Sequence, residues 1–365
     1  MPSVADQADF VLTRSGRSAI VLALRAIGIG PGDRVLVPNY YCPTMIAPVE
    51  YVGAQPVFYP VTQAREPDLD WLASMKFEGR SAMLAAHFFG LPIPLSAVRS
   101  FCDTRGMALI EDCAHAFFGE AAGVPVGISG DFAIASLPKF FPVLEGGLLV
   151  CRVTTAPLKR LARPGAMAEI KALWNITEAA AAYRKIPLLS AAVARISRAR
   201  SAATEVLQAG EQVPVVSERP SPEAVRAEAL ADPLLAPARL RSVERWIIEH
   251  CNRQRLVENR RRNYARLAAQ LSAAAGCRVL FPRIHGGAVP YALPLHVADA
   301  ERVYPHLRAA GLPVYRWDRY WPGAQEVEDG AGLDWGHHVI QISCHQDLTL
   351  EHVDAMANRI ETSLR

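Results

Sequence analysis

The chain has 365 residues, of which 51% are hydrophobic and 21% charged, and its formal net charge is +3. This composition is typical of a globular protein of about two domains, and no apolar run is long enough to cross a bilayer. The weak charge argues against nucleic-acid binding, and the arginine-rich span 253–266 predicts a solvated helix face.

The N-terminal residues MPSVADQADF lack a basic segment followed by an apolar one, so we expect the chain to stay in the cytoplasm. The seven cysteines are odd in number, widely spaced and mostly set in apolar runs. They predict reduced core residues and neither disulfides nor zinc ligands. We find no histidine or carboxylate spacing that predicts a metal site.

Residues 17–27 (RSAIVLALRAI) predict a helix, and Thr13-Arg14-Ser15-Gly16 precede it. Free backbone N–H groups and the dipole at such a helix start attract phosphate, and glycine lets an anion approach closely. An ordinary capped helix is the alternative interpretation.

Strands and helices then alternate, which predicts a mainly parallel sheet with helices on both faces and hence an α/β fold. The predicted strands are 35–37, 55–59, 82–86 and 107–110, and the predicted helices start at about 44 and cover 95–105. Ligands of open α/β sheets bind beyond the carboxyl ends of the strands. We therefore expect one crevice to be faced by Tyr40, Tyr41, His87, Asp112 and His115.

An apolar run over 132–135 leads into a bend that holds Lys139 between Pro138 and Pro142, and a second apolar run follows Glu145-Gly146-Gly147. A lysine held among apolar residues is a candidate amine nucleophile because its pKa is easily lowered. The alternative is a surface lysine in a hairpin turn. With a phosphate-binding helix start, an aromatic ring and the acid Asp112, this lysine suits pyridoxal phosphate (PLP).

Seven motifs in order carry a resemblance: SGRSAI, GIGPGDRVLVPNYYCPT, GAQPVFYPV, HFFGLP, LIEDCAHAFFG, GDFAIASLPKFFPVLEGG and QISCHQDLTLEHV. The chain resembles the DegT/StrS-type aminotransferases, which are fold-type I PLP enzymes, over most of 10–150 and again over about 250–365. The resemblance implies a homodimer with shared active sites. It also implies ping-pong transfer of an amino group from an amino acid, with L-glutamate expected, to a keto or aldehyde acceptor such as a nucleotide-linked keto sugar.

The resemblance assigns roles residue by residue. Lys139 is implied to be the Schiff-base lysine, Asp112 the partner of the pyridine nitrogen and His115 a neighbour of the phenolic oxygen. The remaining implied cofactor contacts are Gly16, Arg17, Ser18 and Ser136 at the phosphate and Tyr41, ahead of Tyr40, as the stacking ring.

Two departures bear on the function. Lys139 is followed by Phe140-Phe141-Pro142 where many relatives have Lys-Asn-Leu-Gly, and 154–240 contains no Gly-x-Asn-x-Arg motif for the neighbouring subunit's phosphate. The alternatives are a PLP-dependent lyase or dehydratase on the same scaffold and a non-catalytic protein of this fold.

We expect a large PLP-binding domain over 1–240, with a variable helical insertion at about 154–237, and a small α+β domain over 241–365. The insertion predicts helices over 166–182 and 188–208 and an exposed arm over 213–222. The small domain predicts a long helical pattern over 238–271, strands over 278–281, 289–295, 313–315 and 339–342, and helices over 298–310 and 349–360, the last capped by Thr349.

Residues 314–323 (VYRWDRYWPG) combine aromatic and basic side chains. Arg316 or Arg319 is a candidate for binding the donor carboxylate, and Tyr320 and Trp321 are candidates for the acceptor pocket. An aromatic cluster covering a helix is the alternative. The other substrate candidates are Tyr40, His87 and His345, the last alternatively holding the junction between domains.

Overall fold

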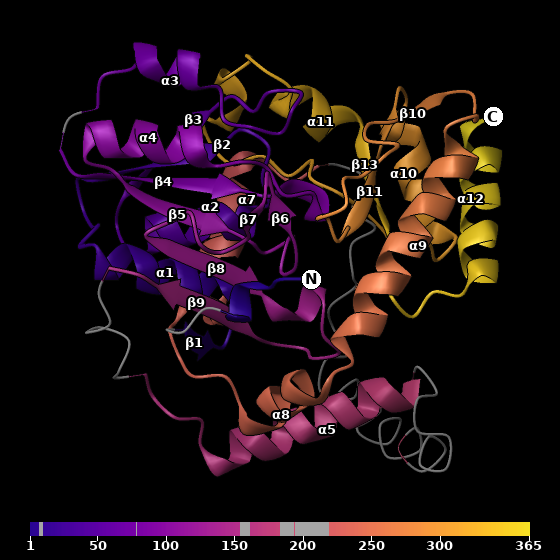
Figure 1. Cartoon of the computed structure of the whole chain (residues 1–365), viewed down its shortest axis with the longest axis horizontal. Helices are drawn as coiled ribbons and strands as arrows, with labels where there is room; N and C mark the ends of the chain where they lie inside the picture. The colour runs from indigo at the N-terminus through magenta and orange to yellow at the C-terminus, as the bar shows by residue number, and fades with distance from the viewer. Residues whose placement is uncertain (7–9, 78, 154–160, 183–192, 194–218) are drawn as a thin grey trace.

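The computed structural model describes residues 1–6, 10–77, 79–153, 161–182, 193 and 219–365 (Figure 1). Apart from residue 193, the predicted helix over 188–208 lies outside the described residues, as do positions 213–218 of the predicted arm.

A seven-stranded sheet forms the larger part of the fold. Every strand except β9 runs in one direction, because β9 pairs antiparallel with both β1 and β8 while the other pairings are parallel. The strands lie in the order β1 (Phe10–Thr13), β9 (Gly147–Cys151), β8 (Phe132–Ser136), β5 (Ala108–Asp112), β4 (Ser81–Ala86), β2 (Arg34–Pro38) and β3 (Gln55–Tyr59). The predicted α/β class and mainly parallel sheet are confirmed.

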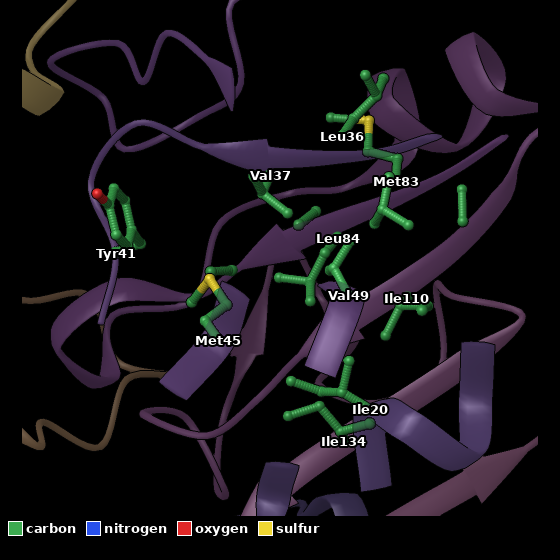
Figure 2. Close-up of a cluster of buried hydrophobic side chains, with 14 of the residues drawn as sticks. Ile20, Leu36, Val37, Tyr41, Met45, Val49, Met83, Leu84, Ile110 and Ile134 are labelled. Carbon is green, nitrogen blue, oxygen red and sulfur yellow. The ribbon is translucent and has the colours of Figure 1, made fainter. Parts of the chain in front are cut away.

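Helices pack on this sheet because its central strands are apolar on both faces. The helices of this part are α1 (Gly16–Ala26), α2 (Pro43–Tyr51), α3 (Leu69–Ser74) and α4 (Ser96–Arg105). Figure 2 shows Ile20 of α1 and Val49 of α2 packed against Leu84, Ile110 and Ile134 of the strands, and all five side chains are buried. Burying such aliphatic side chains contributes about 1.5–3 kcal/mol each.

A second, antiparallel sheet follows in the order β10 (Cys277–Val279), β11 (Ala292–Val297), β13 (Val339–Ser343) and β12 (Val314–Arg316). It shares a separate core with α9 (Arg253–Leu271), α10 (Ala300–Ala309) and α12 (Leu350–Leu364). The Thr349 side chain accepts a hydrogen bond from the backbone N–H of His352, so the predicted cap of α12 is confirmed. The exact domain boundary near residue 240 stays a prediction.

Helix α5 (Ala166–Ala182) has the predicted bounds and lies beside α8 (Ser242–His250), while α7 (Pro222–Leu230) packs on α2. The single helical pattern predicted from 238 to 271 is wrong. Cys251 adopts an extended conformation and ends α8, and the Asn252 side chain accepts a hydrogen bond from the backbone N–H of Arg255 and starts α9. Two helices can share one apolar periodicity, so periodicity alone did not reveal this break.

The remaining short elements are η1 (Val4–Asp6), η2 (Phe88–Gly90), η3 (Leu137–Lys139), η5 (Pro233–Leu235), η6 (Ala324–Glu326), α11 (Gly332–His338) and the hairpin of β6 (Glu120–Ala121) and β7 (Val124–Pro125). All seven cysteines are free, and four of them are buried, while Cys42, Cys251 and Cys277 are only partly buried. Among the described helices, none has the length and apolar character that a bilayer crossing requires.

Candidate active site

A cavity of about 290 Å³ opens where β4, β5 and β8 end, beside the first turn of α1. This is the expected edge, because the carboxyl ends of parallel strands meet there. The cavity lining includes seven residues predicted from the sequence: Gly16, Arg17, His87, Asp112, His115, Ser136 and Lys139.

Lys139 ends the short helix η3, which follows β8 directly. Burial lowers the pKa of its ammonium group, Arg17 lowers it further, and the opposing influences come from Cys42 and Asp112. A larger fraction of the amine is therefore neutral and nucleophilic than in an exposed lysine. The interpretation as a surface hairpin lysine does not fit this position.

Asp112 is the last residue of β5 and is buried. Its Oδ1 accepts a hydrogen bond of 2.7 Å from the backbone N–H of Ala114. Burial raises the pKa of the carboxyl, while that hydrogen bond and the charges of Lys139 and His87 lower it. A cationic group placed in the cavity would favour the carboxylate, since opposite charges nearby stabilise the ionised form.

His115 lies in a stack of rings, with its centroid 4.4 Å from that of Tyr291 and 5.0 Å from that of Trp317. Burial lowers the pKa of the imidazole well below its usual value, and the charge of Lys139 acts in the same direction. The ring is therefore neutral near pH 7. Its Nδ1 is buried and has no hydrogen-bond partner within the described part of the chain, so it is available to a bound group.

The start of α1 contributes its backbone to the cavity, but its side chains are already engaged. Ser15 and Ser18 form a reciprocal capping box, and Ser18 is buried outside the lining, so its phosphate contact stays a prediction. Arg17 lines the cavity, yet its Nη1 lies 2.5 Å from Oδ2 of Asp232. Gly147 lets this turn approach β9, because a Cβ there would lie 2.2 Å from the Ser15 carbonyl oxygen.

The two tyrosines predicted to stack on the cofactor lie outside the cavity lining. The Tyr41 hydroxyl accepts a hydrogen bond of 2.5 Å from the backbone N–H of Trp321, and Figure 2 shows the ring within the hydrophobic cluster. The Tyr40 hydroxyl accepts a hydrogen bond of 3.1 Å from Gln341. Instead, Trp317 and Phe88 contribute aromatic rings to the lining.

His87 lines the cavity but both of its ring nitrogens have partners. Nε2 lies 3.0 Å from Oε1 of Glu111, and Nδ1 accepts a hydrogen bond from the backbone N–H of Ile93. Glu111 also accepts backbone hydrogen bonds from Gly127, Ser129 and Gly130. This buried arrangement fixes the loop after β4 and leaves His87 with little capacity to bind substrate.

None of the other substrate candidates predicted from the second sheet lines the cavity. The Arg316 side chain is buried and donates a hydrogen bond to the His337 carbonyl, and Arg319 pairs with Glu228 at 2.5 Å. Tyr320 packs against His337, and His345 is exposed, with Nδ1 accepting from the backbone N–H of Asp347. The indole of Trp321 is buried and donates to Glu50. The substrate roles of these residues stay predictions.

Sequence reasoning missed residues that the fold brings to the lysine. Arg260, predicted to lie on a solvated face, is buried and donates from Nη2 to the Lys139 carbonyl at 2.6 Å. Gln346 donates to the Phe140 carbonyl at 3.0 Å, and Cys42 and Trp317 line the cavity. The apolar residues Leu256, Tyr264 and Leu267 define the buried face of α9. Arg260 lies four residues from both Leu256 and Tyr264, so this spacing indicates that it shares their face. The high number of arginines in the span obscured that signal.

The chain is similar to known proteins in both sequence and fold. A sequence model described as the DegT/DnrJ/EryC1/StrS aminotransferase family matches residues 5–196, just over half of the chain. The chain is 36% identical over 153 residues to a UDP-N-acetyl-3-dehydro-alpha-D-glucosamine 3-aminotransferase of Acidithiobacillus ferrooxidans, an alignment that covers 37% of this chain and 38% of the relative.

A second relative, a dTDP-3-amino-3,4,6-trideoxy-alpha-D-glucose transaminase of Streptomyces venezuelae, is 37% identical over 132 residues, which is 35% of this chain and 33% of the relative. The aligned part therefore spans between a third and two fifths of these curated relatives. The fold is similar to that of Helicobacter pylori PseC, an aminotransferase of pseudaminic acid biosynthesis, with a TM-score of 0.67, 13% identity and coverage of 98% of this chain and 87% of that chain.

Proposed function

The chain belongs to the DegT/DnrJ/EryC1/StrS aminotransferase family, and on that premise we propose that it is a PLP-dependent aminotransferase. The observation that carries the proposal is the convergence of Lys139, Asp112 and the start of α1 on one cavity. These three features lie far apart in the sequence, and each offers a different chemical group to one ligand.

The residues present fit PLP. The cavity of about 290 Å³ is at the small end of ligand sites, as a compact cofactor requires. Its lining offers a desolvated amine, a buried carboxylate and the buried, unpartnered Nδ1 of His115. Lys139 would hold the aldehyde end, Asp112 the ring nitrogen, and the backbone at Gly16 with Ser136 the phosphate. When bound, PLP supplies an electron sink that stabilises a carbanion at the substrate Cα.

The chain's own residues prepare this chemistry. Burial keeps a fraction of the Lys139 Nζ neutral, so that it can accept a proton from the substrate Cα and return it elsewhere. Asp112 in its ionised form would stabilise a positive charge on the ring nitrogen of PLP. His115 is neutral and offers Nδ1 as a hydrogen-bonding atom without adding a second positive charge beside Lys139.

The acceptor we propose is a nucleotide-linked keto sugar or a related natural-product intermediate, with L-glutamate as the donor. The names of the relatives support this class, since both act on nucleotide sugars. We further propose a homodimer with shared active sites, as the family resemblance implies. A cytoplasmic location stays a prediction from the N-terminal sequence.

Two measurements test the function. The PLP-loaded protein, incubated with glutamate and no acceptor, is expected to shift its cofactor absorbance to shorter wavelength and release one equivalent of 2-oxoglutarate per site. Lys139→Ala should bind PLP without turnover, its rate falling by more than about 10³-fold through loss of the acid–base group. Release of ammonia and a keto acid in place of amino transfer would identify a lyase, and a protein that never binds PLP would contradict the proposal.

A further inference from the structure

Two histidines and one aspartate, His296, Asp334 and His338, form a cluster at the end of the second sheet, outside the cavity that contains Lys139. His296 comes from β11, and Asp334 and His338 lie one turn apart on α11. None of the three lines the cavity described above. The proposed aminotransferase reaction leaves this cluster without a role.

The fold itself brings these three side chains together. Helix α11 runs directly into β13, and Val339, the first residue of β13, pairs with His296 of β11. His338 immediately precedes Val339, so the strand register places both imidazoles together, with ring centroids 5.0 Å apart. The spacing of Asp334 and His338 puts both side chains on one face of the helix.

The donor atoms have the separations of a metal site. The Nε2 of His296 lies 3.2 Å from Oδ2 of Asp334, and the Nδ1 of His338 lies 2.8 Å from Oδ1. All the potential ligand atoms lie within 4.8 Å of one another. In a tetrahedral zinc site with bonds near 2.0–2.1 Å, neighbouring ligand atoms are about 3.3–3.4 Å apart, and the two nitrogen–oxygen separations lie within about 0.6 Å of that spacing.

The chemistry and exposure of the cluster favour one class of ion. Imidazole nitrogens with a carboxylate suit zinc and similar transition metals, whereas magnesium and calcium prefer oxygen ligands. The three side chains are 21%, 42% and 36% exposed, so an ion can enter and water can complete its coordination. Each ring would turn an unprotonated nitrogen toward the ion and carry its proton on the other nitrogen.

We propose that His296, Asp334 and His338 bind one divalent transition-metal ion of the zinc class, with water in the fourth position. The ion would join α11 to β11. Trp335 of the same helix packs against Tyr40 and Phe89, whose centroids lie 5.5 and 5.9 Å away. The site would thereby stabilise the end of the second sheet where it meets the loops of the large sheet.

Calorimetric titration of zinc chloride into the untagged, chelator-treated, cofactor-free full chain tests the proposal. We expect one ion per chain, and at least a tenfold loss of affinity in both His338→Gln and His296→Gln. His337→Gln is the matched control, since His337 is adjacent on α11 but outside the cluster. Cobalt should give the visible bands of a tetrahedral site in wild type and in His337→Gln, but not in the two cluster variants.

Zinc should also raise the thermal unfolding temperature of the wild type and of His337→Gln, and leave that of the cluster variants unchanged. The proposal is overturned if the wild type binds no zinc, or if binding survives unchanged in both cluster variants. The ion would then be absent or held elsewhere. Because the cofactor is left out, these results do not depend on the proposed aminotransferase activity.

Discussion

The buried guanidinium of Arg260 donates a hydrogen bond of 2.6 Å to the main-chain carbonyl of Lys139. Its Nε donates to Gln346 Oε1 at 2.8 Å, and Gln346 in turn donates to the Phe140 carbonyl at 3.0 Å. The guanidinium also lies 4.6 Å from the centroid of the Phe140 ring. Helix α9 and the segment after β13 therefore hold the backbone of the lysine turn, so the position of the lysine depends on both sheets.

Arg260→Met tests this support. Burial lowers the pKa of Arg260 to about 10, which shows that its hydrogen bonds must offset a desolvation cost. Methionine would fill the space but deprive the Lys139 carbonyl and the side-chain Oε1 of Gln346 of their donor, at about 1–3 kcal/mol of unfolding free energy. We expect turnover to fall by roughly tenfold to a hundredfold, because the amine is displaced from its working position.

Denaturant unfolding and steady-state kinetics measure both effects, and Arg262→Met, an exposed position on the same helix, is the control. The control should match the wild type. If Arg260→Met loses stability but keeps the wild-type turnover and the wild-type pH response of Lys139, then the arginine supports the fold and does not position the lysine.

The lowered pKa of Lys139 predicts a specific labelling profile in the cofactor-free protein. Because burial disfavours the ammonium form, the neutral amine of Lys139 should appear at a lower pH than that of a lysine in a short model peptide. The acylation rate of Lys139, measured by mass spectrometry against pH, should therefore reach half its maximum at a lower pH than that of the model peptide. PLP should protect Lys139 from acylation. A midpoint equal to that of the model peptide would show that the amine is solvated.

The sequence predicted the large sheet and its ligand edge well, because short apolar runs and alternating helices are local signals. It also placed Asp112 and Lys139 at strand ends that proved to be neighbours. It failed where contacts join distant segments: no local pattern shows that Asp232 pairs with Arg17 or that the Tyr41 hydroxyl faces Trp321. The prediction of Tyr41 as the stacking ring was based only on its position in the motif. The orientation of the ring depends on Trp321, which lies 280 positions away.

The aromatic lining of the cavity leads to a comparison of Trp317 and Tyr41. Trp317→Ala removes a ring that packs on His115 and lines the cavity, so PLP affinity should fall roughly threefold to tenfold, in line with about 0.5–1.5 kcal/mol for an aromatic pair. Tyr41→Leu, which removes the ring, should leave PLP affinity near the wild-type value and lower stability, since the backbone N–H of Trp321 loses its acceptor. Absorbance titrations with PLP measure the affinities. A larger loss of PLP affinity in Tyr41→Leu than in Trp317→Ala would identify the tyrosine as the stacking ring.

Cys42 gives a reporter of cofactor occupancy that needs no substrate. It precedes α2, is only partly buried and lines the cavity, whereas four of the other cysteines are buried in the core. Iodoacetamide should therefore alkylate Cys42 in the cofactor-free protein, and PLP should slow that reaction because the cofactor would occupy the adjoining space. The added amide group should also weaken later PLP binding. Mass spectrometry of the alkylated peptides identifies the modified cysteine. Cys42→Ser is the control variant and should retain PLP binding after the same treatment. Cys251, which is also partly buried but lies outside the lining, is the internal reference that PLP should not protect. If PLP protects Cys251 as strongly as Cys42, the effect is a general tightening of the fold and the cavity is not the place where the cofactor binds.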